Sequence, residues 1–258
     1  MRIAVHSDLH LEGYPLPATF LEDTSYDVLV LAGDIVSART MSRLKLIRNL
    51  VPRDKRVIYV PGNHEWYGAH SYESQLSNLQ ELCGSLGFDL LTRNAVKIGD
   101  AVFVGCVSWS TLDSYQEFPF EQKREEVDFG ISDFRAIGGF SVDKMISIGE
   151  QDKRFLFNAC SAVREFAGDN TKIVYVTHFA PTEAHGNPKF APTRISSYFS
   201  NSLEEVCYAD VAPDLWIYGH THFNYDVYRS VYHTQFVANQ RGYGNECHNY
   251  NPNFILEI

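Results

Sequence analysis

Carboxylate, amide and imidazole side chains occur at five places in this 258-residue chain, each directly after a short apolar run. They are Asp8 and His10 in SDLH, Asp34 in GD, Asn63 and His64 in GNHE, His178 in VTHFAP, and His220 and His222 in GHTH. Carboxylate oxygen and imidazole nitrogen together suit borderline divalent ions such as Mn²⁺, Fe²⁺ and Zn²⁺. The absence of thiolates from this set argues against a structural zinc site. We therefore expect a metal-binding site assembled from five separate segments.

The spacing inside these motifs also fits a shared ion. In an extended or irregular loop, residues i and i+2 lie on the same side, which places Asp8 with His10, and likewise pairs the two histidines of GHTH. A glycine before a ligand lets the backbone turn tightly and approach an ion closely. Such glycines are Gly33, Gly62 and Gly219. An exposed loop, a helix cap or a buried structural histidine explains any one motif, but five motifs in this order favour a joint metal site.

Short apolar runs rich in β-branched residues precede the motifs and are the expected strands. They are Ile3–Val5, Val28–Ala32, Val57–Val60, Ala101–Val107, Ile173–Val176, Leu215–Tyr218, Val227–Tyr232 and Phe254–Ile258, with a further strand near Gln235–Ala238. The helical stripes between them are Met41–Leu50 ending before Pro52, Tyr72–Cys83 stopped by Gly84, and Leu156–Ala167 stopped by Gly168. Strands that alternate with helices predict an α/β fold. Strand ends in open α/β sheets converge on one crevice, so the motifs should meet there.

The composition is that of an acidic, folded chain. Lys and Arg total 22 and Asp and Glu total 32, which gives a formal net charge of −10, and 45% of the residues are apolar. A phosphate backbone or an anionic membrane surface attracts a basic face, so this charge argues against broad binding of nucleic acid or membrane. No run approaches the roughly 20 apolar residues of a membrane helix, and no secretory signal is visible. The five cysteines are scattered singly, which predicts reduced thiols and a cytoplasmic protein.

The sequence contains no internal repeat or flexible linker, which favours one domain over residues 1–258. The segment at about 110–149 differs from the rest, because it combines the charge-rich stretch Glu121–Glu126 with paired glycines. We predict a lid-like excursion over one face of the domain, with short helices. Lys123 and Arg124 are flanked by acids, which predicts a solvated face of mixed charge in this segment.

Together the motifs resemble the signature of the calcineurin-like metallophosphoesterases. The resemblance rests on Asp8-Leu9-His10, Gly33-Asp34, Gly62-Asn63-His64-Glu65, His178 and Gly219-His220-Thr221-His222. It implies a four-layer α-β-β-α sandwich of two mixed β-sheets, with a dinuclear metal site at the carboxyl ends of the strands. By position, it implies that Asp8, His10 and His222 hold one ion, that Asn63, His178 and His220 hold the second, that Asp34 bridges both, and that His64 is the catalytic histidine.

The function implied by this resemblance is hydrolysis of a phosphodiester or phosphomonoester in a small-molecule substrate. Two divalent ions (Mn, Fe or Zn) about 3.5–4 Å apart would share a hydroxide whose pKa they lower, and it would attack phosphorus in line. His64 would stabilise the transition state or protonate the leaving oxygen. Two alternatives are a metal-dependent nuclease and a non-catalytic scaffold of the same fold. The net charge disfavours the nuclease, and the presence of His64 with all seven ligand positions disfavours the scaffold.

The sequence departs from the family pattern after its Gly-Asp motif. Many members carry a second Asp and an Arg where this chain has Ser37 and Ala38. In relatives that Asp orients the catalytic histidine, so here Glu65, a backbone carbonyl or a residue from elsewhere must orient His64. The Arg that is missing acts as a phosphate clamp. Arg241, in a segment similar to N-P-R-G-Y of bacterial members, is our candidate substrate-binding residue, the alternative being a structural arginine paired with an acid.

Overall fold

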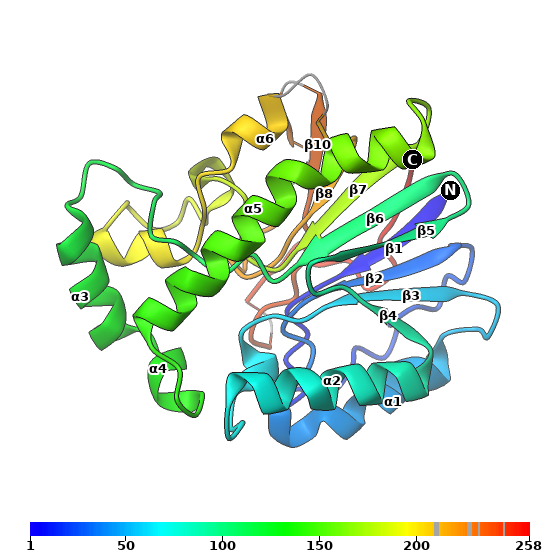
Figure 1. The fold of residues 1–258 in the computed structure, drawn as a ribbon. Coiled ribbons are helices and arrows are strands. Elements are labelled where there is room, and N and C mark those ends of the chain that lie inside the picture. The colour runs from blue at the N-terminus through cyan, green and yellow to red at the C-terminus, as the bar shows by residue number, and fades with distance from the viewer. Residues whose placement is uncertain (209–211, 226–228, 232, 245) are drawn as a thin grey trace.

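The computed structural model describes residues 1–208, 212–225, 229–231, 233–244 and 246–258. Two β-sheets are stacked face to face, with helices on their outer faces (Figure 1). In spatial order, the first sheet consists of β11 (Ile255–Glu257), β1 (Arg2–His6), β2 (Val28–Ala32), β3 (Arg56–Val60) and β4 (Phe88–Leu90). The second consists of β5 (Asn94–Ile98), β6 (Ala101–Cys106), β7 (Lys172–Thr177), β8 (Leu215–Ile217), β10 (Thr234–Val237) and β9 (Arg229–Val231).

Both sheets are mixed, as predicted. Strands β1 to β4 are parallel, and β11 runs antiparallel to β1 with Arg2 opposite Glu257. In the second sheet β6, β7, β8 and β10 are parallel, while β5 and β9 are antiparallel edge strands. The loops that follow β1, β2, β3, β7 and β8 therefore leave the two sheets at the carboxyl ends of parallel strands, where side chains from several strands meet.

The core has three parts because successive side chains of a strand face opposite ways. In β1, Ile3 and Val5 pack between the two sheets, whereas Ala4 faces the helices that cover the first sheet. The middle layer also contains Phe103 and Val176 from the second sheet. Full burial of such a side chain stabilises the fold by about 1.5–3 kcal/mol. The two stacked sheets and the helices on their outer faces make a four-layer α-β-β-α sandwich.

Helices α1 (Leu44–Leu50) and α2 (Tyr72–Leu86) cover the first sheet, and α5 (Val142–Ala167) crosses the second (Figure 1). The prediction that Gly84 stops α2 is wrong, because the helix continues past it and ends at Gly87, whose φ of 70° is the left-handed conformation of a C-terminal cap. Helix α5 ends before Gly168 as predicted, but it begins at Val142, far earlier than Leu156. Ser141 caps this beginning by accepting a hydrogen bond from the Lys144 N–H at 3.2 Å.

The predicted excursion at 110–149 contains α3 (Phe120–Gly130) and α4 (Asp133–Ala136), and its last residues belong to α5. Figure 1 shows α3 and α4 beyond one end of the sheets. The prediction that Lys123 lies on a solvated face is wrong, because its side chain is buried and its Nζ donates to the Ser114 carbonyl at 2.7 Å. This hydrogen bond ties the first turn of α3 to the loop that precedes it.

The remaining elements are short. They are the 3₁₀ helices η1 (Ala38–Arg43), η2 (His64–Trp66), η3 (Glu183–His185) and η4 (Arg194–Tyr198), and the helix α6 (Glu204–Tyr208). The predicted strand Val227–Tyr232 falls partly outside the described residues, and β9 is the part that is described. Within the described ranges, no helix is both long enough and apolar enough to span a bilayer.

Candidate metal centre and active site

The loops that follow the strands hold their polar side chains in an unusual backbone conformation. Asp8 and His10 have φ of 53° and 47°, and Asp34 has 54°. Residues other than glycine seldom adopt this left-handed backbone conformation, and each instance costs of order 1–3 kcal/mol. Backbone hydrogen bonds hold the loops in place: the N–H of Asp8 donates to the Gly33 carbonyl and that of His10 to the Asp34 carbonyl, both at 2.9 Å. The two motifs therefore form one rigid unit.

The loop after β8 has the same character. His220 and His222 have φ of 72° and 47°, and the N–H of His220 donates to the Asp8 carboxylate at 3.1 Å. Glycine is required where these loops pass one another. A Cβ on Gly33 would collide with the His178 ring, and Gly33 itself has φ of +86°. The close approach of His178 to β2 thus depends on a residue without a side chain.

The side chains of these loops form two adjoining groups of potential ligands. In the first group, His222 Nε2 lies 3.3 Å from Asp8 Oδ1 and 3.1 Å from His10 Nε2. The two imidazole nitrogens face each other, and either ring can direct a lone pair at a cation between them. Asp8, His10 and His222 are thus brought together as predicted.

The second group surrounds His178. Its Nε2 lies 3.4 Å from Asp34 Oδ1 and 3.1 Å from Asn63 Oδ1, and the ligand atoms of Asp34, His178 and His220 lie within 4.8 Å of one another. Asp34 also faces the first group, because its Oδ2 lies 3.9 Å from His10 Nε2. The structure therefore places Asp34 between the two groups, where the resemblance puts a bridging carboxylate.

The donor set fits divalent cations. Among the described residues, His220 Nε2 is buried without a hydrogen-bond partner, an arrangement that costs about 1–3 kcal/mol unless something else binds the atom. Burial lowers the pKa of His178, but the carboxylate of Asp34 outweighs it and raises that pKa to about 9. Asp8 and Glu246 likewise outweigh burial and raise the pKa of His222 to about 10. Carboxylates that hold protons on imidazoles so strongly would also attract a metal ion.

Further polar groups orient the potential ligands. The Nδ1 of His178 donates to the Ala32 carbonyl at 2.9 Å, which leaves Nε2 free to face Asp34. Glu246 lies 2.7 Å from Nδ1 of His222. Asp133 of α4 accepts from the Asn63 amide at 3.1 Å, which turns the Asn63 Oδ1 towards His178. The 110–149 segment thus contributes directly to the geometry of the site, a role that the sequence analysis did not assign.

Glu65 does not orient His64. Its buried carboxylate accepts from the backbone N–H groups of Asp34, Ile35 and Val36 at 2.8–3.1 Å and from the Tyr59 hydroxyl at 2.7 Å. Burial and the nearby Asp34 raise the pKa of Glu65 to about 7. Glu65 therefore fixes the loop after β2 rather than the histidine beside it in sequence.

The group that contacts the His64 ring is Glu12, which the sequence analysis missed. Glu12 Oε1 lies 2.8 Å from His64 Nδ1 and 3.1 Å from His10 Nδ1. Ser37, at the position of the missing Asp, contacts Thr40 instead, with 3.1 Å between their hydroxyl oxygens. The signal lay in the sequence Asp-Leu-His-Leu-Glu, which places a carboxylate two residues after a predicted ligand.

His64 is held on three sides. Its ring stacks on Tyr67 with centroids 4.1 Å apart, and its Nε2 lies 3.2 Å from the Tyr243 hydroxyl and 3.8 Å from Asp34 Oδ2. Burial lowers the pKa of His64, but Asp34 and Glu12 outweigh it and raise that pKa to about 9. Because Nδ1 contacts Glu12, the ring presents Nε2 to Asp34 and to the pocket described below.

Arg241 is not brought together with these residues. Its Nη1 donates to the carbonyls of Pro15 at 2.7 Å and Leu9 at 3.3 Å, and its guanidinium lies 5.9 Å from the centre of the Tyr14 ring. It lines a separate recess with Pro17 and Tyr250. These contacts favour a structural role, with backbone carbonyls in place of the acid that we considered, and substrate binding by Arg241 stays a prediction.

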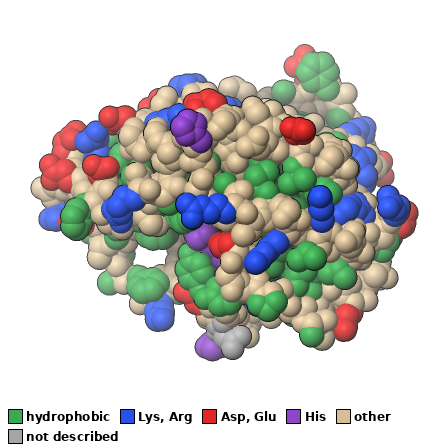
Figure 2. Space-filling model, turned by 90° about the horizontal axis from the view of Figure 1, so that it is seen from below, with side chains coloured by type: hydrophobic (Ala, Val, Ile, Leu, Met, Phe, Trp, Pro, Cys, Tyr) green, Lys and Arg blue, Asp and Glu red, His purple; other side chains and the backbone are tan. Residues whose placement is uncertain are grey.

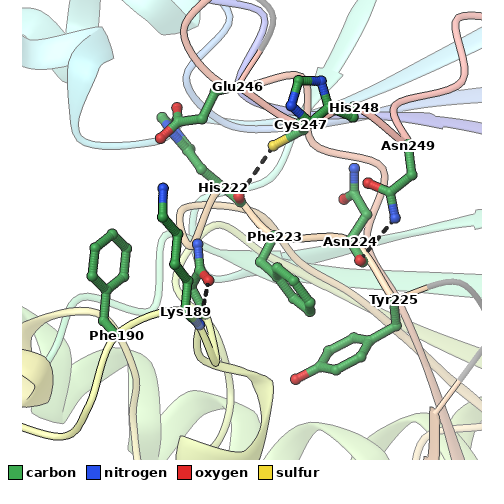
Figure 3. Close-up of a pocket in the computed structure, with 11 residues that line it drawn as sticks. Lys189, Phe190, His222, Phe223, Asn224, Tyr225, Glu246, Cys247, His248 and Asn249 are labelled. Atoms are coloured by element: carbon green, nitrogen blue, oxygen red, sulfur yellow. Dashed lines mark hydrogen bonds and ion pairs between the residues drawn. The ribbon is translucent and has the colours of Figure 1, made fainter.

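A pocket of about 290 Å³, here called the catalytic pocket, opens over the two groups of potential metal ligands. Its walls include Asp34, Asn63, His64, His220 and His222, with Phe190, Phe199 and Tyr243 at its rim. A second pocket of about 460 Å³ shares His222 and Glu246 with it. Figure 3 shows this second pocket, with Phe190 and Lys189 on one side and the amides of Asn224 and Asn249 on the other.

Two stacked mixed sheets with Asp, Asn and His side chains at their strand ends define a hydrolase of the metallophosphoesterase type. The chain belongs to the calcineurin-like phosphoesterase family, whose sequence model matches residues 1–224. The expected family and fold are therefore confirmed, and the protein's general class is that of the phosphoester hydrolases.

Known proteins from several organisms are similar to this chain. An uncharacterized protein of Acanthamoeba polyphaga mimivirus is 26% identical over 245 residues, which cover 89% of this chain and 83% of that protein. The structure of phosphopantetheinyl hydrolase from Mycobacterium tuberculosis superposes with a TM-score of 0.72 at 17% identity, over 95% of this chain and 90% of that one. A putative 5'-nucleotidase from Staphylococcus aureus gives 0.51 at 13% identity, over 93% and 49%. At these identities the structural likeness establishes the fold.

Proposed function

We propose that this protein hydrolyses a small-molecule phosphate ester, monoester or diester, at a dinuclear divalent metal centre. The observation that carries the proposal is the convergence of side chains from five strand ends around Asp34, which faces both groups of potential ligands. Asp8, His10 and His222 would hold one ion, Asn63, His178 and His220 the other, and Asp34 would contact both. When bound, such ions supply a nucleophilic hydroxide at neutral pH and neutralise charge on the phosphoryl oxygens.

His64 would act on the leaving group. Its Nε2 faces the catalytic pocket while Glu12 binds Nδ1, so the ring is positioned to give a proton from Nε2 to the departing oxygen. Asp34 and Glu12 favour the protonated ring, which is the form that can donate. Tyr243, whose hydroxyl lies 3.2 Å from Nε2, limits the directions in which the ring can point.

The distribution of surface charge supports a small substrate rather than a nucleic acid. On the face seen in Figure 2, Lys and Arg side chains lie in separate spots among hydrophobic, acidic and uncharged surface. A nuclease that tracks a phosphate backbone needs a continuous basic stripe.

Four of the five free cysteines are buried, which fits the expected reduced state and a cytoplasmic protein.

The experiment that tests the proposal is a matrix of metals and substrates. Metal-stripped protein is reloaded with Mn²⁺, Fe²⁺, Zn²⁺ or Ni²⁺ and assayed on a chromogenic phosphomonoester and a chromogenic phosphodiester. We expect turnover that depends on metal and is abolished by chelation. Absence of turnover with every metal on both esters would contradict the proposal and favour the scaffold.

A further inference from the structure

A hollow of about 520 Å³, here called the side recess, adjoins the catalytic pocket. The two share Asn187, Phe190, Phe199 and Thr221, so no wall of protein separates them. The rest of the side recess is lined by residues that include Tyr115, Ala191 and Ile195. A substrate whose phosphate lies over the metal groups can therefore extend its organic group into the side recess.

Phe199 connects the side recess to the metal groups. Its ring stacks on the ring of His220, with centroids 5.4 Å apart and an interplanar angle of 27°. Phe199 is 37% exposed and Phe190 is 64% exposed, although both are large and apolar. Neighbouring exposed aromatic side chains beside a polar pocket are a feature of ligand-binding clefts, where a ligand covers them.

The charges around the side recess also limit what can bind there. Among the described residues that line it, none is a carboxylate, and Lys189 is the one charged group. The Nζ of Lys189 lies 5.7 Å from the centre of the Phe190 ring, and both residues also line the second pocket shown in Figure 3. Among these lining residues a cationic group would find no carboxylate partner, whereas an apolar group would contact Tyr115, Phe190 and Phe199.

We propose that the side recess binds a bulky apolar portion of the organic group of the substrate. This inference rests on the proposed function, because it places the phosphate of the same ester over the metal groups. The substrate class is thereby narrowed to phosphate esters of alcohols that carry a ring system or a comparable apolar unit. Binding energy from this unit would hold the phosphorus in place for attack.

The test compares two esters of primary alcohols that differ in apolar size. Ethyl and 2-(1-naphthyl)ethyl phosphate are assayed as monoesters and as their p-nitrophenyl diesters, on metal-loaded wild type and two variants. Ala191→Trp places a large ring in the side recess, because Ala191 lines that hollow and neither of the other two pockets. Phe166→Ala is a surface control, since Phe166 is 87% exposed at the end of α5 and lines none of the three.

We expect wild type to favour the naphthyl ester in kcat/KM by at least about tenfold, equivalent to about 1.4 kcal/mol. In Ala191→Trp the ratio of the two esters should fall to within about twofold of unity. Phe166→Ala should keep the wild-type ratio. Turnover without discrimination in wild type, or discrimination that survives in Ala191→Trp, would overturn the side recess while the proposed function stands.

A binding measurement separates the two proposals if no ester is hydrolysed. Naphthyl fluorescence then reports binding of 2-(1-naphthyl)ethylphosphonate, and ethylphosphonate is measured by competition. Binding of the naphthyl compound at least about tenfold tighter in wild type, and not in Ala191→Trp, would support the side recess as a ligand site. Equal binding of both compounds would overturn it.

Discussion

The strand-end loops and the segment Gly186–Phe199 border the same pocket but are built differently. Asp8 and His10 are 0% and 1% exposed, and hydrogen bonds tie their loop to that of Asp34 across the sheet. Phe190 is 64% exposed, and its N–H donates to the Asn187 carbonyl only three residues away, at 3.2 Å. The comparison indicates that the potential ligands are fixed by long-range contacts, whereas Phe190 is held by a local turn. The rest of its segment is tied to distant residues, because Asn187 donates to the Thr221 carbonyl and Tyr198 to Asp133.

The largest expected loss of activity is for a substitution in the strand-end loops. Asp34→Asn removes the carboxylate charge that faces both ligand groups, so kcat/KM should fall by at least about 10³-fold. Bound metal, measured by inductively coupled plasma mass spectrometry, should fall as well. Asp128→Asn, the same change at an exposed position of α3, is the control. Full metal content and turnover in Asp34→Asn would show that the two groups do not share this residue.

A second substitution separates metal binding from proton transfer. His64→Ala should lower kcat by about 10²–10⁴-fold, because it removes the proposed proton donor, while the metal content stays at the wild-type level. Metal content and turnover are measured on the same samples. If turnover is unchanged, the role given to His64 is wrong, and if metal is lost, His64 is a ligand.

Glu12 should have a smaller effect, because it acts through His64. Glu12→Gln should lower kcat by about 10–100-fold at saturating metal. The loss should be greater for alkyl esters, whose leaving oxygen needs a proton, than for p-nitrophenyl esters, whose leaving group does not. Glu22→Gln, on the surface, is the matched control. Equal losses on both kinds of ester would mean that Glu12 supports the fold or the metal ligands instead of proton donation.

The smallest effect on catalysis is expected for Arg241, outside the catalytic pocket. Its guanidinium binds the Leu9 and Pro15 carbonyls, so Arg241→Ala should change KM by less than about threefold. The free energy of unfolding should fall by about 1 kcal/mol, because those hydrogen bonds are lost. Kinetics and urea unfolding measure the two quantities. A tenfold rise in KM without loss of stability would support the phosphate-binding role predicted from the sequence.

The sequence predicted the strands well where both faces are buried. Runs such as Val28–Ala32 lie between the two core layers and contain only apolar residues, so their composition alone marks them. Strand β5 was missed because it lies at an edge and alternates weakly between half-buried and exposed positions. A signal was present nonetheless: Gly99-Asp100 joins β5 to β6 as a two-residue hairpin turn.

The candidate site was predictable in its residue types and less so in its supporting contacts. Asp8, His10 and Asp34 follow strands directly, and strand order carries them to one crevice. Glu12 was missed although it stands two residues after His10, because its contact with His64 depends on the left-handed backbone of the loop after β1. The burial of Lys123 was predicted wrongly, because it depends on contacts outside its own helix, such as that with the Ser114 carbonyl.

The pairing of β11 with β1 has a consequence for how the protein is made. The strand that leads to Asp8 and His10 is completed on one side only when residues 255–257 have been synthesised, because Arg2 pairs with Glu257 and Ala4 with Ile255. Until then β1 is an edge strand, whose unpaired backbone is open to other chains. The strand that carries the Asp8 and His10 loop is therefore protected on this side only by residues that lie far along the chain.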